Sequence, residues 1–138
     1  MGHERKVVAM SEPRLKTVKH MVAEARERIH TLSVEQVATE IEGGDTTLID
    51  LREDDERFLE GTIPNSLHVP RGMIELSADP TSPLHRQELD PERRIIVYCS
   101  SGSRSALAAD TLQRMGYKEV AHLEGGMMAW KEDKRPVE

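Results

Sequence analysis

The chain has 138 residues, of which 37% are hydrophobic and 32% are charged, so it suits one domain with a buried core rather than two. Acidic residues number 25 and basic ones 19, and the net charge of −6 argues against a broad surface for nucleic acid or an anionic membrane. No stretch approaches the roughly 20 apolar residues that span a bilayer, and charged residues stand where a signal peptide is apolar. We therefore expect a cytoplasmic protein that does not enter a membrane.

The sequence contains a single cysteine, Cys99. One thiol cannot close an internal disulfide, and it leaves a metal site without the usual cluster of cysteines. The six histidines are scattered and form no H-x-x-x-H pair. We therefore expect neither a metal nor another cofactor.

The first helix is predicted within residues 11–30, after a flexible arm over residues 1–10. Ser11 can cap this helix and Pro13 suits its first turn. Apolar residues then recur at helical spacing: Leu15, Val18, Val22, Ala25 and Ile29. We expect this stripe to pack on the domain, and a docking surface for a partner protein is the alternative.

A domain of alternating helices and strands is expected over residues 31–133. Ser33 with Gln36 forms a capping-box pattern, which predicts a short helix through Ile41 that a pair of glycines ends. The run from Thr46 to Asp50 is β-branched and apolar, and predicts a buried strand with a carboxylate at its carboxyl end.

A further helix of one or two turns is predicted from Glu53 to Glu60, with Phe58 and Leu59 facing inward. A short strand from Ser66 to Val69 and a helix from Arg71 to Leu76 should follow. Prolines bracket the next stretch, which predicts a loop over residues 78–92.

The strongest strand signal is the apolar run from Arg94 to Tyr98, of the kind found inside parallel sheets. A helix from Ser105 to Met115 and a strand from Glu119 to Leu123 should follow, and then a helix containing Trp130. The charged segment from Lys131 to Glu138 is expected to be solvated, with its first residues finishing this helix and residues 134–138 forming the tail. Alternating strands and helices predict an α/β fold with a central parallel sheet and helices on both faces.

The loop after the strongest strand carries the chemistry. Cys99 stands at its start, at the carboxyl edge where open α/β sheets bind ligands. The small residues after it, with Gly102, allow backbone N–H groups to form an anion nest above the next helix. That helix end and Arg104 both favour a thiolate. A buried structural cysteine is the alternative, and a reactive thiol fits this setting better.

Four segments, in this order along the chain, resemble the motifs of single-domain rhodanese-like sulfurtransferases. The active-site loop corresponds to residues 98–105 (YCSSGSRS), and the first signature to residues 49–53 (IDLRE). The G-x-I-P-G-A turn corresponds to residues 61–66 (GTIPNS), and the closing G-G-x-x-x-W element to residues 123–130 (LEGGMMAW). Asn and Ser replace the usual Gly and Ala of the turn, which asparagine tolerates because it adopts positive φ readily.

The resemblance implies that Cys99 accepts a sulfane sulfur as a persulfide from a sulfur-containing anion such as thiosulfate, or from a persulfide donor. The acceptor would be a thiol, cyanide or a protein, because a lone cysteine cannot discharge its own persulfide. The residues expected to form the anion-binding rim are Ser100, Ser101, Gly102, Ser103 and Arg104.

Three further residues, Asp50, Arg52 and Arg71, are weaker candidates for supporting roles, and the role of Asp50 depends on where Arg104 points. Arg104 either points into the pocket or holds the loop through a carboxylate such as Asp50, and the sequence favours neither arrangement. Asp50 is then a loop-fixing acceptor. Arg52 and Arg71 each follow a strand end and could flank the pocket, although exposed surface charges are the safer interpretation.

Two other functions compete with sulfur transfer. Cysteine phosphatases and arsenate reductases also cradle a thiolate beside an arginine, but the phosphatases have five residues between the two and this chain has four. Rhodanese-like domains also serve as binding modules or sulfur carriers, because a fold does not fix a function. We expect a monomer, since the composition indicates no strong interface.

Overall fold

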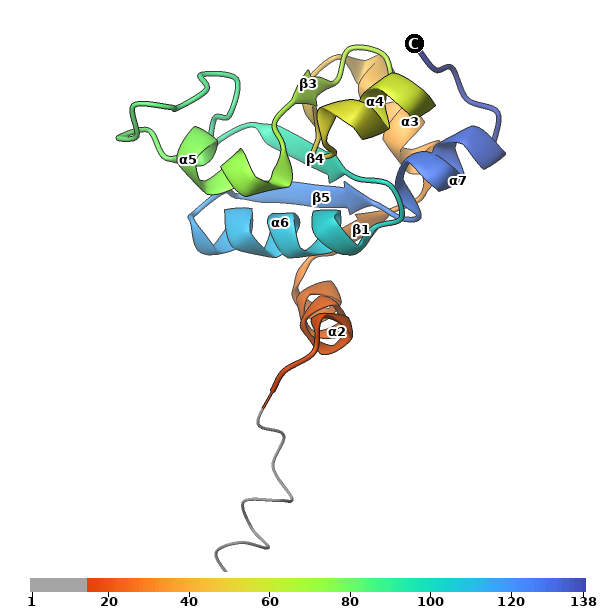
Figure 1. Ribbon diagram of the computed structural model, residues 1–138. Coiled ribbons are helices and arrows are strands. Elements are labelled where there is room, and N and C mark those ends of the chain that lie inside the picture. Colours follow the sequence, from red (N-terminus) through yellow and green to blue (C-terminus); the bar gives the residue numbers. More distant parts are fainter. Residues whose placement is uncertain (1–14) are drawn as a thin grey trace, which may run out of the picture.

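The computed structural model describes residues 15–138, shown in Figure 1. The arm predicted over residues 1–10, and the roles predicted for Ser11 and Pro13, lie outside the described residues. Within 15–138 no helix is both long and apolar enough to cross a bilayer.

The core of the fold is a sheet of five parallel strands in the order β1-β5-β4-β2-β3. The strands are β1 (His30–Leu32), β2 (Thr46–Asp50), β3 (Leu67–His68), β4 (Arg94–Tyr98) and β5 (Glu119–Leu123). The parallel α/β architecture confirms the predicted fold class. The sequence pattern missed β1 because three residues at the sheet edge give no periodicity to detect.

Helices cover both faces of the sheet (Figure 1). They are α2 (Val18–Arg28), α3 (Val34–Gly43), α4 (Asp54–Glu60), the 3-10 turn η1 (Arg71–Met73), α5 (Ile74–Ala78), α6 (Ser103–Arg114) and α7 (Gly126–Glu132). The predicted capping box is present at the start of α3, where Ser33 and Gln36 each accept a backbone N–H of the other. Between α5 and β4 the chain forms turns without a regular helix, as the prolines indicated.

The central strand β4 divides the core into two layers. Ile95 and Val97 face α5 and α6, and Ile96 and Tyr98 face α3 and α7. All four are fully buried, because successive side chains of a strand alternate between the faces of the sheet. Cys99 continues the Ile95 face, which places its thiol beneath the start of α6.

Helix α2 contacts the domain with only part of its length. Its buried residue, Ala25, lies near the carboxyl end, where Arg28 pairs with Asp110 of α6 at 2.8 Å. The earlier apolar residues are exposed, Leu15 at 81% and Val18 at 63%. The predicted packing therefore applies to the second half of the stripe, and the first half faces solvent.

The prediction that Phe58 and Leu59 of α4 face inward is wrong. Their exposed fractions are 88% and 76%. The helix turns its polar side to the domain instead, because Arg57 forms an ion pair at the end of β2 and Glu56 forms one at the start of α6. Two ion pairs decide the orientation of a seven-residue helix that buries no residue.

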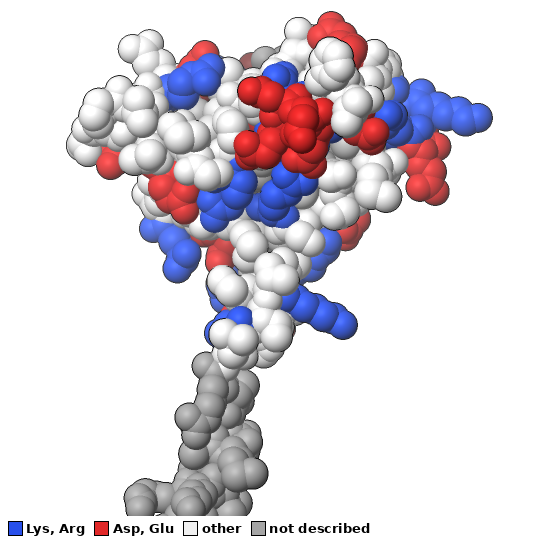
Figure 2. Space-filling view, in the orientation of Figure 1, with Lys and Arg blue, Asp and Glu red and all other residues white. Residues whose placement is uncertain are grey.

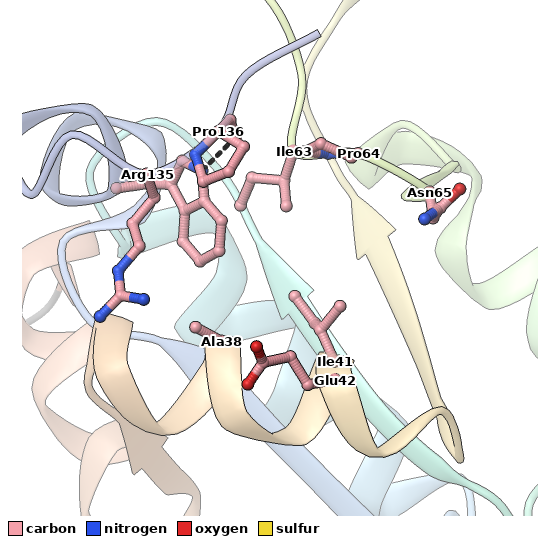
Figure 3. A pocket seen from close by; sticks show the side chains of 9 residues that line it. Ala38, Ile41, Glu42, Ile63, Pro64, Asn65, Arg135 and Pro136 are labelled. Carbon is pink, nitrogen blue, oxygen red and sulfur yellow. Dashed lines mark hydrogen bonds between the residues drawn. The ribbon is translucent and has the colours of Figure 1, made fainter.

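The tail over residues 134–138 is largely exposed, and its backbone folds back onto the domain. Thr62 and Glu138 exchange two backbone hydrogen bonds of 3.0 and 2.9 Å. The indole of Trp130 donates to Pro136 O at 2.8 Å, drawn as a dashed line in Figure 3. The tail thereby closes one side of a cavity of about 300 Å³ against α3 and the turn at residues 63–65. No residue of the Cys99 loop lines this cavity.

Candidate functional site

The candidate site lies where β4 ends and α6 begins, near the middle of the carboxyl edge of the sheet (Figure 1). Tyr98 is the last residue of β4, and Ser103 is the first of α6. Only four residues connect them, and Gly102 makes the turn with a φ of 114°. This left-handed conformation is one that glycine adopts without steric strain.

The sulfur of Cys99 is buried in a cradle of hydrogen-bond donors. It accepts the backbone N–H of Gly102 at 3.2 Å and that of Ser105 at 3.4 Å. The Ser105 hydroxyl lies 3.6 Å from the sulfur. Amide donors at the N-terminus of a 12-residue helix stabilise negative charge, so the site favours a thiolate or another sulfur anion.

The remaining predicted rim residues surround this cradle without touching the sulfur. Ser101 and Ser103 are exposed, and Ser100 is half-buried. The hydrogen bonds to the sulfur come instead from Gly102 and from Ser105. Sequence analysis placed Ser105 in the helix but did not assign it to the site.

A second residue that sequence analysis missed is His122, on β5. Its Nδ1 lies 2.9 Å from the Ser105 hydroxyl, and its Nε2 lies 3.1 Å from the hydroxyl of Thr31 on β1. Burial, reinforced by the positive charge of Arg26, lowers the pKa of His122 to about 4. A histidine inside an otherwise apolar strand was the available signal, because such a residue needs buried polar partners.

Arg104 turns away from the sulfur and binds Glu56 of α4. Both pairs of atoms are 2.7 Å apart, as in a bidentate guanidinium–carboxylate contact. The hydrogen bonds from Arg104 lower the pKa of Glu56 to about 2. Of the two roles left open by the sequence, this geometry is the loop-holding one, and the carboxylate is Glu56 rather than Asp50.

Asp50 is fully buried and is the acceptor at the centre of a separate network. Arg52 binds it at 2.9 and 3.0 Å, and the Tyr98 hydroxyl donates to it at 2.9 Å. Burial by itself would raise the pKa of Asp50, but the hydrogen bonds and charge of Arg52 outweigh it and lower that pKa. The interpretation of Arg52 as an exposed charge is wrong, since its side chain is 1% exposed.

Arg71 is placed apart from these contacts. Among the described residues it pairs with Glu75 at 3.2 Å and donates to the Thr111 hydroxyl at 3.4 Å. Thr111 lies about two turns along α6 from the loop. The structure therefore does not bring Arg71 to the sulfur.

The start of α7 is fastened to the Cys99 loop through the backbone. Met127 N donates to Cys99 O at 2.8 Å, and Met128 N donates to Ser100 O at 3.1 Å. Gly126 makes this approach possible with a φ of 56°, and a Cβ on it would lie 2.7 Å from Ser100 O. Met127 is buried in the core, whereas Met128 is 60% exposed.

Charged side chains frame the loop on two sides. On one side Arg26 of α2 pairs with Glu124 at 2.8 Å, and its guanidinium lies 3.4 Å from where a Cβ on Gly102 would be. On the other side is α4, with Asp54, Asp55 and Glu56 in its first turn. Figure 2 shows a group of acidic side chains with basic ones directly beneath it.

Several known proteins are similar to this chain in sequence or in structure. A sulfurtransferase of Allochromatium vinosum is 33% identical over 93 residues, which are 67% of this chain and 78% of that protein. The polysulfide-sulfur transferase homodimer of Wolinella succinogenes has a similar structure, with a TM-score of 0.72 and 34% identity over 87% of this chain and 85% of that one. A Rhodopseudomonas palustris protein of unknown function, described as a possible tyrosine phosphatase, has a TM-score of 0.86 and 36% identity, covering 92% and 98%.

The model of the rhodanese-like domain matches residues 33–133. This range includes the four segments that suggested the resemblance, and confirms it. The chain belongs to the rhodanese-like domain family.

Proposed function

We propose that the protein is a sulfurtransferase that carries sulfane sulfur as a persulfide on Cys99. The observation that carries this proposal is the pair of backbone N–H groups at 3.2 and 3.4 Å from a buried sulfur at a helix N-terminus. Such an arrangement stabilises the anionic sulfur species on both sides of the reaction.

In the first half-reaction, the Cys99 thiolate attacks the outer sulfur of thiosulfate or of a persulfide donor. The S–S bond of the donor breaks, and its electron pair leaves with sulfite or with the donor thiolate. The transferred sulfur remains bonded to Sγ. In the second half-reaction, an acceptor thiolate or cyanide attacks this outer sulfur, and the electron pair of the Sγ–S bond returns to Cys99.

The acceptor comes from outside the chain, because Cys99 is the single cysteine. A small thiol or a protein thiol fits this role, and a compartment that keeps thiols reduced, such as the cytoplasm, suits a free reactive cysteine. In this proposal the rim of Ser100, Ser101, Gly102 and Ser103 receives the anionic end of the donor, and Arg104 holds the loop through Glu56. Asp50 and Arg52 support the loop from the core, and Arg71 remains a more distant charge that could guide an anion.

The deciding experiment is the intact mass of the protein after incubation with thiosulfate, with Cys99→Ser as the control. We expect a gain of one sulfur atom that is absent from the variant and is reversed by cyanide or a thiol. Absence of this gain with thiosulfate and with a persulfide donor would refute the proposal.

A protein-bound sulfur carrier is the second candidate, and the exposed half of α2 favours it. Leu15 precedes the helix, Val18 and Met21 lie in its first turn, and the three side chains are 81%, 63% and 44% exposed. An exposed apolar patch of this kind is typical of a surface for a partner. A carrier would form the persulfide from a protein donor faster than from thiosulfate, and Leu15→Ser with Val18→Ser would slow only the protein-dependent reaction.

The oligomeric state bears on the same surface. We retain the monomer as our proposal, although the Wolinella succinogenes relative is described as a homodimer. Light scattering at several protein concentrations distinguishes the two, and a dimer that the α2 substitutions dissociate would overturn the monomer.

Phosphatase activity is less well supported by the site. Four residues separate Cys99 from Arg104, and the guanidinium that would hold a phosphate is paired with Glu56 instead. Hydrolysis of p-nitrophenyl phosphate that is lost in Cys99→Ser would reverse this ranking.

A further inference from the structure

Beneath the Cys99 sulfur lies a chain of polar side chains that the sulfur-transfer step does not by itself require. It runs from the sulfur to the Ser105 hydroxyl, then to His122, and ends at the Thr31 hydroxyl. Ser105 and His122 are both fully buried. Buried polar groups are costly unless paired, so this chain is a specific arrangement rather than a chance contact.

The imidazole of His122 has one hydrogen-bond partner at each ring nitrogen. The groups that face it are the hydroxyls of Thr31 on β1 and Ser105 on α6, together with the charges of Arg26 on α2 and of Glu124 after β5. Arg26 and Glu124 carry charge, and they pair with each other at 2.8 Å. Burial and the charge of Arg26 keep the pKa of His122 far below neutrality, so the ring is uncharged and carries one proton on one of its two nitrogens.

We propose that His122 is a positioning residue that, acting through Ser105, holds a hydroxyl hydrogen bond on the anionic sulfur of Cys99. This inference rests on the proposed sulfurtransferase function. It assigns a role to two residues outside the loop from Cys99 to Arg104.

The position of the imidazole proton determines the direction of the whole chain. With the proton on Nε2, the ring donates to Thr31, and Nδ1 accepts the Ser105 hydroxyl proton. Ser105 Oγ is then free to accept the S–H of the neutral thiol. With the proton on Nδ1, the ring donates to Ser105 Oγ, and the hydroxyl proton of Ser105 points either to Gly102 O at 3.2 Å or to the sulfur at 3.6 Å.

The second arrangement adds a third donor to the two amides that already contact the sulfur. A thiolate or a persulfide accepts hydrogen bonds only, so it favours the state in which Ser105 donates. The proton lost by the thiol passes to solvent and does not remain on the imidazole, because His122 stays neutral. The ring therefore changes tautomer without changing charge.

The first test measures how far the thiolate of Cys99 is stabilised, in the absence of any sulfur donor. Thiolate absorbance reports on one residue here, because the chain has one cysteine. The two tyrosines do not interfere, since burial raises the pKa of Tyr98 and of Tyr117 to about 12. The pH at half-maximal thiolate signal is compared with the midpoint of the iodoacetamide rate profile.

We expect Ser105→Ala and His122→Leu each to move both midpoints upward by about one pH unit, the effect of losing one hydrogen bond to a charged group. Ser105→Thr keeps the hydroxyl and should restore the midpoint to within a few tenths of a unit. His85→Asn is the matched control, because this histidine is also partly buried and bonded but lies against Ser77 O, in another part of the fold. It should leave the midpoint unchanged.

The double variant Ser105→Ala with His122→Leu tests whether His122 acts on the thiolate through Ser105 or separately from it. If His122 acts through Ser105, the double variant shifts the midpoint no further than Ser105→Ala does. Additive shifts would overturn the proposal. A folded His122→Leu protein with the midpoint of the wild type would also overturn it, and circular dichroism verifies folding.

A measurement on the unaltered protein covers the case in which a variant does not fold. Nitrogen chemical shifts of the histidine rings distinguish the Nδ1–H and Nε2–H tautomers. We expect the Nδ1–H form of His122 to gain population when Cys99 ionises, and a tautomer that does not respond would overturn the proposal. Neither test uses a sulfur donor, so a failure to form a persulfide, which refutes the proposed function, is recognised separately.

Discussion

Replacing Gly126 by alanine should damage the Cys99 loop from a position that never touches the sulfur. Gly126 begins α7 with a φ of 56°, and its backbone lies against the carbonyl groups of Cys99 and Ser100. A Cβ there would contact both carbonyl oxygens, with Ser100 O at 2.7 Å. Because the contacts are backbone atoms, no side-chain rotation can relieve them.

The cost has two parts. The left-handed backbone costs an alanine about 1–2 kcal/mol, and forcing an extra carbon into a packed site adds about 1–3 kcal/mol. The sum, roughly 2–5 kcal/mol, is a large share of the roughly 5–15 kcal/mol by which domains are stable. If the loop moves to relieve the clash, part of this cost appears instead as a displaced Cys99.

The matched control is Gly44→Ala. Gly44 has a φ of 84° at the end of α3, and nothing lies within 4 Å of the added carbon. This variant should therefore lose only the free energy of unfolding that the left-handed backbone costs an alanine, about 1–2 kcal/mol. Urea unfolding measures both free energies, and the rate of persulfide formation by mass spectrometry measures the loop.

We expect Gly126→Ala to unfold at least about 1 kcal/mol more easily than Gly44→Ala, and to form the persulfide several-fold more slowly. Equal stabilities together with equal rates would refute the idea that α7 fixes the loop by close backbone contact. A large loss of stability with an unchanged rate would show that the clash is relieved away from Cys99.

Three other predictions follow from buried or paired charges. The pKa of His122 is depressed from 6.5 to about 4. This residue should therefore add about 3 kcal/mol to the free energy of unfolding above pH 6.5, and the contribution should be lost as the pH falls through 4. His122→Leu should abolish this pH dependence of the free energy of unfolding. Glu56→Gln removes the partner of Arg104 and should lower the free energy of unfolding by about 1 kcal/mol near neutral pH. This difference should shrink as the pH approaches 2 and disappear in high salt. A difference that does not depend on salt would contradict an ion-pair origin. Asp50→Asn leaves Arg52 buried without a counter-charge and should cost about 3–5 kcal/mol, readable as a lower Tm; an unchanged Tm would show that the pair is dispensable.

The sequence predicted the sheet well wherever strands are buried on both sides. The residues from Arg94 to Tyr98 form the central strand as expected, because an apolar run of this length has few other stable arrangements. The turn residue Asn65 has a φ of 67°, as its tolerance of positive φ suggested. The limits of the domain, residues 31–133, remain a prediction, as do the roles given to the loop residues.

The errors fall where pairing between polar side chains, which the hydrophobic pattern does not reveal, decides how a side chain is oriented. Phe58 and Leu59 read as an inward stripe, but the ion pairs of Arg57 and Glu56 orient their helix the other way. The burial of Arg52 depends on Asp50, only two residues away, and on how both side chains turn into the core. His122 lies 17 residues from Ser105, and no local spacing relates the two.

The indole of Trp130 gives the protein a natural optical probe. It is the single tryptophan of the chain and is 3% exposed. It stands on the same short helix whose first turn holds the backbone of Cys99, and its N–H is tied to the carboxyl-terminal segment at Pro136. Loading or unloading of sulfur that loosens this helix will therefore change the emission of one known fluorophore. Each half of the proposed sulfur transfer is then open to measurement in real time without a label, a coupled enzyme or a coloured substrate.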